Sequence, residues 1–247
     1  ISFFYNRRDF PLLTKDETEP YNHMWGTKNL KLLSHNYPSY CPILSGSTNE
    51  RFADILLPTW DDWARVENLE NKWYKGTCRD YNYTFNQNWS SKKPTAVFRG
   101  STTGSGVDVN TNSRLKACLI GSVLGQEDDY LDAGISKWNL RPRKDESSDY
   151  LETIDINKLP FKLSNTLSPE EQSNYKYILN IDGHVAAYRL SVELSMYSVV
   201  LLVKSDWKLW YSDKLIPYKH YIPIKSDLSD LIEQIKWCRE NDKLCEE

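Results

Sequence analysis

From residue 93 onward, short apolar β-prone segments alternate with helical segments, and this alternation is the feature that most restricts the possible folds. The predicted strands occupy residues 95–98, 131–135, 175–181, 199–203 and 220–224. Strands that alternate with helices are typical of a parallel sheet in a Rossmann-like α/β domain. Such sheets bind ligands at the carboxyl ends of their strands, so functional residues are expected at those positions.

Apolar spacing and capping residues predict the helices between these strands. Residues 113–123 and 184–194 are predicted to be helical, and the sequence Ser-Pro-Glu-Glu at 168–171 is a helix start. The last helix is the clearest. Asp227 is placed to cap it, and one apolar stripe follows, made of Leu228, Leu231, Ile232 and Ile235.

Composition changes near residue 92, where we place a domain boundary. Five of the nine tryptophans precede it, and the polar run at 89–94 ends in proline and is predicted to be a linker. The chain is therefore predicted to contain two domains, residues 1–92 and 93–247.

Charge, hydropathy and cysteine content exclude several classes of protein. The chain has 31 Lys and Arg against 34 Asp and Glu, so its net charge of −3 argues against nucleic acid as the main partner. The longest apolar run, residues 199–203, is far shorter than the ~20 residues of a membrane span, and no signal peptide is visible. Five cysteines without C-x-x-C spacing favour a cytoplasmic location. Sequons at Asn82 and Asn88 favour the alternative, the secretory lumen.

Two predicted strands end in residues suited to an anion. The first is followed by Arg99, Gly100 and Ser101, and residues 175–181 are followed by Gly183, His184 and, further on, Arg189. A helix beginning near His184 would offer free N–H groups, and two converging arginines would suit a diphosphate. The alternative is two ordinary turns with surface arginines, because neither segment matches a dinucleotide fingerprint or a P-loop.

No pattern typical of a metal site is present. The chain has no D-x-D motif, and its four histidines are far apart in sequence. We therefore expect a diphosphate to be bound without a metal, and no cofactor.

The first domain contains candidates for acid–base chemistry and for sugar binding. Asp9 follows Arg7 and Arg8, which would hold it ionised as a general base; the alternative is a loop Asp paired with an Arg. Asp54 lies near Trp60 in an acid–aromatic cluster that suits a sugar ring, although tryptophans are more often part of a core.

Several segments together resemble the CAP10-like glycosyltransferases of family GT90, which include Rumi-type protein O-glucosyltransferases and fungal capsule xylosyltransferases. The matching stretches follow the family order and lie at residues 6–11, 53–60, 98–104, 175–190, 220–224, 227–228 and 237. The resemblance implies a GT-B fold, with two Rossmann-like domains facing a cleft, the first on the acceptor side and the second binding the nucleotide sugar. It also implies a UDP-sugar donor, inversion at the anomeric carbon and no required metal.

The resemblance also implies roles for individual residues. Asp9 matches the general base of the family's R-D-[FY]-P motif. Arg8, Asp54 and Trp60 fall on the acceptor side. The implied donor-binding positions are Arg99, Gly100, Ser101, Arg114, Gly183, His184, Arg189 and Ser198.

The chain departs from the family pattern in two places. An E-R-D triplet found in some relatives is absent, and Arg114 replaces part of it; Tyr197 stands where a glycine is common.

The main hypothesis is a metal-independent, inverting transferase that moves xylose or glucose, with a slight preference for xylose, from a UDP-sugar to a hydroxyl of a glycan or glycoprotein. The alternative is a non-catalytic relative that binds a glycan or nucleotide. A metal-dependent hydrolase is disfavoured because the chain lacks a ligand cluster and a G-x-S-x-G elbow.

Overall fold

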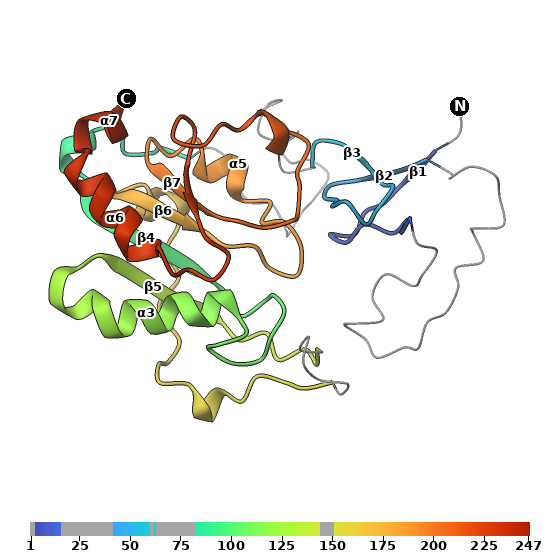
Figure 1. Cartoon of the computed structure of the whole chain (residues 1–247), viewed down its shortest axis with the longest axis horizontal. Helices are drawn as coiled ribbons and strands as arrows, with labels where there is room; N and C mark the ends of the chain where they lie inside the picture. The colour runs from blue at the N-terminus through green and yellow to red at the C-terminus, as the bar shows by residue number, and fades with distance from the viewer. Residues whose placement is uncertain (1–2, 16–41, 60–61, 63–82, 144–150) are drawn as a thin grey trace.

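The computed structural model describes residues 3–15, 42–59, 62, 83–143 and 151–247 of the chain. These residues form two parallel sheets, of three and five strands (Figure 1). No helix among them is long and apolar enough to cross a membrane.

The larger sheet has the strand order β5-β4-β6-β7-β8, and every neighbouring pair is parallel. All five predicted strands are confirmed. Their bounds are β4 Lys93–Ser101, β5 Leu131–Lys137, β6 Tyr175–Asn180, β7 Val199–Val203 and β8 Ile222–Ile224. Helices are placed around this sheet, as expected for a Rossmann-like α/β unit. Because the strands are parallel, we call the side where they end the carboxyl edge and the side where they begin the amino edge.

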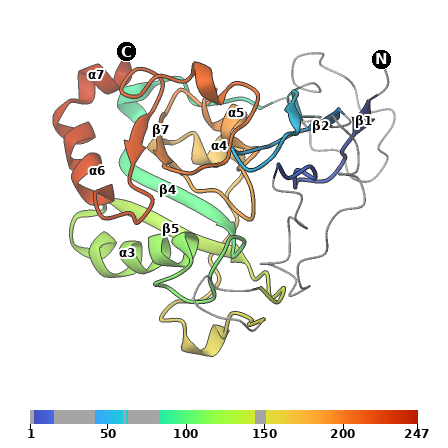
Figure 2. The ribbon, with the colours of Figure 1, turned by 45° about the vertical axis from the view of Figure 1, so that its right-hand side comes forward.

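Helix α3 (Ser113–Asp128) lies along β5, as Figure 2 shows. Its start is fixed by Asn112, whose side chain accepts hydrogen bonds from the backbone N–H groups of Arg114 and Leu115. The main hydrophobic core joins α3, the sheet and the last helices. Its fully buried members include Phe98, Leu115, Tyr177, Leu201, Leu231 and Ile235.

The C-terminal helices are α6 (Leu231–Glu240) and α7 (Asp242–Glu246). The predicted apolar stripe is buried at Leu231 and Ile235, but the predicted cap is wrong: the helix is preceded by Asp230, and the Asp227 carboxylate instead accepts a hydrogen bond from the Ser229 N–H. Helix α4 (Pro169–Gln172) begins with the predicted capping box.

The helix predicted over residues 184–194 is largely absent. Only α5 (Leu190–Glu193) is helical, and a series of turns precedes it. Asp182 accepts a hydrogen bond from the Ala187 N–H at 2.7 Å, and the Gly183 N–H donates to the Val185 carbonyl. These local bonds replace the first helical turns, so no helix N-terminus lies at His184.

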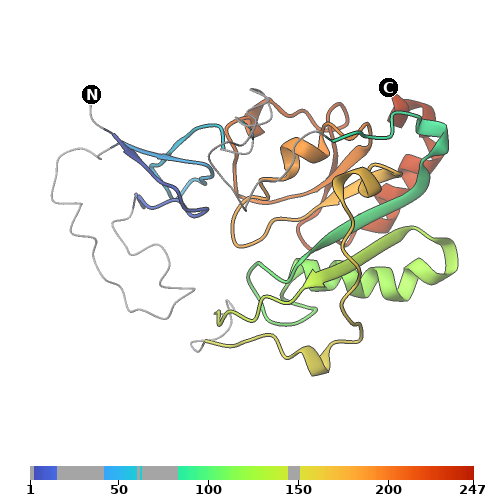
Figure 3. The same ribbon diagram turned by 180° about the vertical axis from the view of Figure 1, so that it is seen from behind.

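The smaller sheet contains β1 (Phe4–Tyr5), β2 (Ile43–Ser45) and β3 (Ile55–Leu56) in that order. The connection from β2 to β3 contains no helix. Seen from behind in Figure 3, this sheet lies at the end of the molecule remote from α6 and α7. It is joined to the larger unit by two backbone hydrogen bonds between Thr48 and Lys208 and by a ring contact between Phe52 and Trp207.

The linker predicted at residues 89–94 is wrong. A 3-10 helix, η2 (Trp89–Ser91), begins this run, and Trp89 is buried in the main core. The buried Lys92 ammonium donates to the carbonyls of Ser173 and Met196 and to the Ser198 hydroxyl, at 2.6–2.9 Å. The run is therefore packed against the larger sheet. Two further 3-10 helices are η3 (Ile156–Lys158) and η4 (Ser212–Lys214).

Candidate active site

Asp9 lies in the loop after β1, where the two sheets meet. Its backbone carbonyl accepts hydrogen bonds from the Tyr188 hydroxyl, at 2.8 Å, and from the Ser47 hydroxyl, at 2.7 Å. Its carboxylate is exposed and forms no ion pair within the described residues, so the expected pairing with Arg7 or Arg8 is not formed. Asp9 and Arg8 line a pocket of about 170 Å³, the Asp9 pocket, whose wall also includes Gly46, Pro58 and Tyr188.

Asp54 is buried and supports this loop. Its carboxylate accepts hydrogen bonds from the N–H groups of Leu12 and Leu13 at 2.9 and 2.7 Å, and from the Ser45 hydroxyl at 2.6 Å. Ser45 in turn accepts a hydrogen bond from Asn6, which also donates to the Phe10 carbonyl. Asp54 therefore positions the Asp9 loop rather than facing the Asp9 pocket.

Arg99 is bound within the protein. Its guanidinium forms an ion pair with Asp132 at 2.7 Å and donates to the carbonyls of Asp132 and Asn165. Neighbouring side chains on a strand point to opposite faces, so Arg99 points away from the adjacent Phe98. The predicted convergence of the Arg99 and Arg189 guanidinium groups is not formed.

Arg114 and Arg189 instead approach the Phe98 ring, with guanidinium carbons 5.9 and 5.2 Å from its centroid. Arg114 donates to the carbonyls of Ser101, Ile181 and Asp182, and so ties together the ends of β4 and β6. Burial lowers the pKa of Arg114 to about 9, with a further contribution from Arg189, and the group remains cationic at neutral pH.

Arg189 has one polar group left for a ligand. It pairs with the buried Glu193 at 2.9 Å and donates through Nη1 to the Arg99 carbonyl. Its Nη2 forms no hydrogen bond among the described residues. An arginine held in this way presents an oriented donor, which suits recognition of a phosphate oxygen.

His184 lies between the two parts of the chain. Its Nδ1 accepts a hydrogen bond from the Gly104 N–H, and its ring stacks on Phe10 with centroids 6.1 Å apart. Burial, with the repulsion of Arg143, Arg141 and Arg114, lowers its pKa to about 4. The ring is therefore neutral at pH 7, and its buried Nε2 has no hydrogen-bond partner among the described residues.

Arg141 and Arg143 were not identified from the sequence. Arg143 is 2% exposed and donates to the carbonyls of Thr102 and Gly104, so it holds the loop after β4. Both arginines closely follow β5, whose end lies at the carboxyl edge. Their position after a predicted strand in a parallel sheet was the signal that could have revealed them.

A larger pocket of about 500 Å³, the strand-end pocket, lies at the carboxyl ends of β7 and β8. Its lining includes Ala186 and Ala187 beside Asp182, and Lys204 and Ser205 after β7. Small side chains beside a few polar groups suit a flat organic ligand.

Comparison with known proteins identifies the relationship. Glycosyl transferase family 90 matches residues 9–247, nearly the whole chain. The chain belongs to this family. The resemblance seen in the motifs is thereby confirmed.

Individual relatives agree with this family 90 assignment. Uncharacterized protein 179R of Invertebrate iridescent virus 6 is 50% identical over 100% of this chain, which covers 24% of that protein. Human Protein O-glucosyltransferase 3 is 30% identical over 83% of the chain, covering 36% of that protein. The O-glucosyltransferase rumi homolog of Aedes aegypti is 25% identical over 83%, covering 48%. The chain spans less than half the length of each.

The structure brings most of the family 90 motif positions together at the carboxyl edge, but not all of them. The backbones of Gly100, Ser101 and Gly183 lie around Arg114, and a side chain on Gly183 would collide with Thr103. Ser198 lies at the amino edge, where its hydroxyl donates a hydrogen bond to the Tyr175 carbonyl. Its predicted contact with the nucleotide sugar is therefore not supported. Trp60 lies outside the described residues.

Within the described residues, no group of three or more His, Cys, Asp or Glu side chains is arranged to hold a metal ion. The carboxyl edge instead carries a cluster of four cationic side chains: Arg114, Arg141, Arg143 and Arg189. The arrangement can bind an anionic group beside an exposed carboxylate.

Proposed function

We propose that the chain is an inverting glycosyltransferase that moves a sugar from a UDP-sugar donor to a hydroxyl of a glycan or glycoprotein. The observation that supports it best is the Tyr188–Asp9 hydrogen bond of 2.8 Å, which ties the exposed carboxylate loop to the cationic carboxyl edge. Both partners belong to stretches that resemble family motifs. Xylose and glucose are the donor sugars we propose, with a slight preference for xylose.

In this proposal the donor lies along the carboxyl edge. The strand-end pocket receives the uridine, and Arg189 with the loop at residues 102–104 receives the diphosphate. Arg114 and Arg143 add positive potential, although their own N–H groups are used by backbone carbonyls. The anomeric carbon then points toward the Asp9 pocket.

The transfer step uses the exposed carboxylate. Asp9 accepts the proton of the acceptor hydroxyl while that oxygen attacks the anomeric carbon and the carbon–oxygen bond to UDP breaks. The electron pair of that bond remains on the diphosphate, where the cations stabilise the developing charge. Attack opposite the departing UDP inverts the anomeric configuration.

Three further properties belong to the same proposal. The two domains, predicted as 1–92 and 93–247, form a GT-B pair with the acceptor bound on the first, and residues 89–92, which pack against the larger sheet, belong with the second. No metal is required, so turnover is expected to survive EDTA; loss of turnover restored by Mn²⁺ would contradict this.

The protein acts in the cytoplasm, and addition of N-glycans at Asn82 or Asn88 in cells would instead indicate the secretory lumen.

The test combines a transfer assay with a donor-binding assay. Asp9→Asn keeps the shape of the side chain but cannot accept the proton, so turnover should fall ~10²- to 10⁴-fold with UDP affinity unchanged. Asp128→Asn, an exposed change at the end of α3, is the matched control and should keep full turnover. Release of UDP at the wild-type rate by Asp9→Asn would require another base. UDP binding without any transfer by the wild type would favour the non-catalytic alternative.

A further inference from the structure

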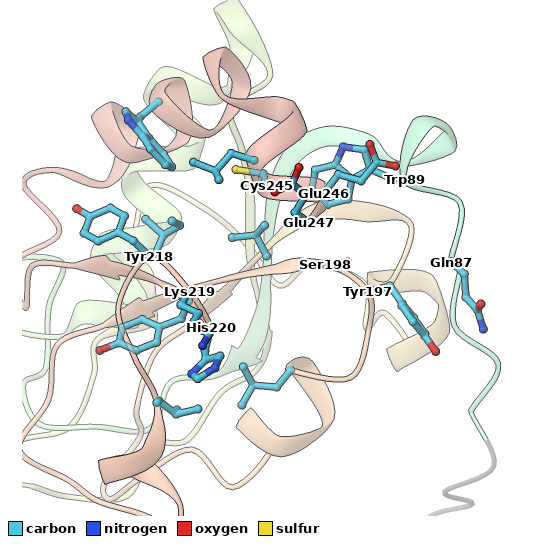
Figure 4. A pocket seen from close by; sticks show the side chains of 17 residues that line it. Gln87, Trp89, Tyr197, Ser198, Tyr218, Lys219, His220, Cys245, Glu246 and Glu247 are labelled. Atoms are coloured by element: carbon cyan, nitrogen blue, oxygen red, sulfur yellow. The ribbon is translucent and has the colours of Figure 1, made fainter.

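A third pocket, of about 680 Å³, lies at the amino edge of the larger sheet. The starts of β7 and β8 form its floor, and α7 contributes one wall. In Figure 4, Tyr218 and Tyr197 lie on opposite sides of this space, with Glu246 above and His220 below. We call it the tyrosine pocket.

Two of its three lining tyrosines are held in an unfavourable backbone conformation. Tyr197 and Tyr218 have φ angles of 53° and 58°, in the left-handed region that favours glycine. This conformation is energetically costly for a residue with a bulky side chain. Neither ring recovers that cost by deep burial, because the two residues are 57% and 56% exposed. Strain that holds two exposed rings beside one pocket points to binding.

The rest of the lining combines aromatic and polar side chains. Trp237 contacts Tyr218 edge-on, with ring centroids 5.8 Å apart, and Trp89 and Tyr221 complete the aromatic set. The His220 Nδ1 accepts a hydrogen bond from the Ile216 N–H, which leaves its Nε2–H as a donor. Gln87, Lys219 and Glu246 add donors and acceptors.

We infer that the tyrosine pocket binds a neutral carbohydrate, at a site separate from the transfer site. The C–H face of a sugar ring packs on an aromatic face, and its hydroxyls need both donors and acceptors at the rim. Glu246 disfavours a phosphorylated ligand, and the charged rim disfavours a purely apolar one. The volume accommodates two to three sugar rings, within the usual ~300–1,000 Å³ range of ligand pockets.

The site does not depend on the proposed transfer reaction. Tyr218 and Tyr221 line both the tyrosine pocket and the strand-end pocket, so they form a shared wall between the two. Binding at the amino edge is nevertheless expected to proceed when the candidate active site is occupied by UDP.

The test is isothermal titration of the purified chain with xylotriose, cellotriose and maltotriose, each with and without saturating UDP. At least one sugar should bind, with UDP leaving its affinity unchanged. Tyr197→Gly should weaken binding about tenfold while leaving the melting temperature the same or higher, because glycine tolerates the positive φ. Tyr197→Phe keeps the ring and should bind normally, as should Phe4→Ala, an exposed aromatic change elsewhere.

Three results would overturn the inference. One is the absence of binding to all three sugars. Another is unchanged binding in both Tyr197→Gly and Tyr218→Ala. The third is loss of sugar binding in Asp9→Asn or by competition with UDP, which would assign the sugar to the transfer site. Failure of transfer activity alone would leave binding at the tyrosine pocket intact, so the two proposals are separated.

Discussion

The two parallel sheets are stabilised by different interactions. The five-stranded sheet contains β6, which is buried along its whole length, and the fully buried Phe98 and Leu201. In the three-stranded sheet, Phe4 and Ile55 are more than half exposed, and order depends on the buried polar group formed by Asp54 and Ser45. The larger sheet is thus held by apolar burial, and the sheet that bears Asp9 is held by oriented hydrogen bonds. This difference means that the order of the Asp9 loop can change separately from the stability of the whole protein.

The largest expected effect comes from the core of the larger sheet. Leu201→Ala removes a fully buried side chain from β7 and should lower the free energy of unfolding by ~2–5 kcal/mol. The matched change Ile55→Ala, on the exposed β3, should cost less than ~0.5 kcal/mol. Chemical denaturation measures the free energy of unfolding of both variants. Equal decreases would contradict the difference proposed between the two sheets.

Asp54→Asn tests the polar support of the smaller sheet. An amide in place of the carboxylate loses charge-assisted bonds to Leu12, Leu13 or Ser45, at a cost of ~1.5–3 kcal/mol. Hydrogen exchange at residues 6–13 should accelerate and turnover should fall, while UDP affinity stays constant. Unchanged exchange in this segment would show that Asp54 does not position the Asp9 loop.

Substitutions of Arg99, near the end of β4, and of Arg189, beside α5, should have different effects. Arg189→Ala should weaken UDP binding ~10- to 100-fold, since a charge-assisted bond to phosphate is lost, and should also lower stability, because the buried Glu193 loses its ion-pair partner. Arg99→Ala should mainly lower stability, because its guanidinium is bound by Asp132. Titration calorimetry with UDP, alongside thermal melts, separates the outcomes. If UDP affinity falls more in Arg99→Ala than in Arg189→Ala, then Arg99 rather than Arg189 binds the phosphate.

A pH dependence of stability is also expected from His184. Its pKa is about 4 in the folded chain and near 6.5 when unfolded. As pH falls from 6.5 to about 4, the unfolded state gains a proton that the folded state does not, so stability decreases over that window and not above it. His184→Gln should flatten this part of the curve. If the pH dependence of stability is unchanged in His184→Gln, then His184 is not its source.

The sequence predicted elements whose pattern is local. Residues 199–203 match β7, and the capping box at Ser168 is present, because apolar runs and caps are determined by near neighbours. The helix over 184–194 was wrong because Asp182 bonds to Ala187 and competes with helix formation. Propensity does not reveal such a bond.

Site residues were predictable as segments but not as contacts. The motifs at Asp9, Ser101 and Gly183 fall in the three segments that meet near Tyr188 and His184. A guanidinium group can bind a ligand only if no other residue already binds it, and those partners are distant in sequence, such as Asp132 for Arg99. Similarly, the predicted linker failed because the contacts of Lys92 are made more than 80 residues away.

The burial of Lys92 also makes it a chemical reporter. The residue is 3% exposed, and burial lowers the pKa of its amine to about 8. An acylating reagent should modify the surface lysines within minutes and leave Lys92 unmodified for as long as the larger sheet is intact. Once that sheet opens, the amine becomes accessible, so mass spectrometry of this single site would report opening of the larger sheet separately from motions of the Asp9 loop.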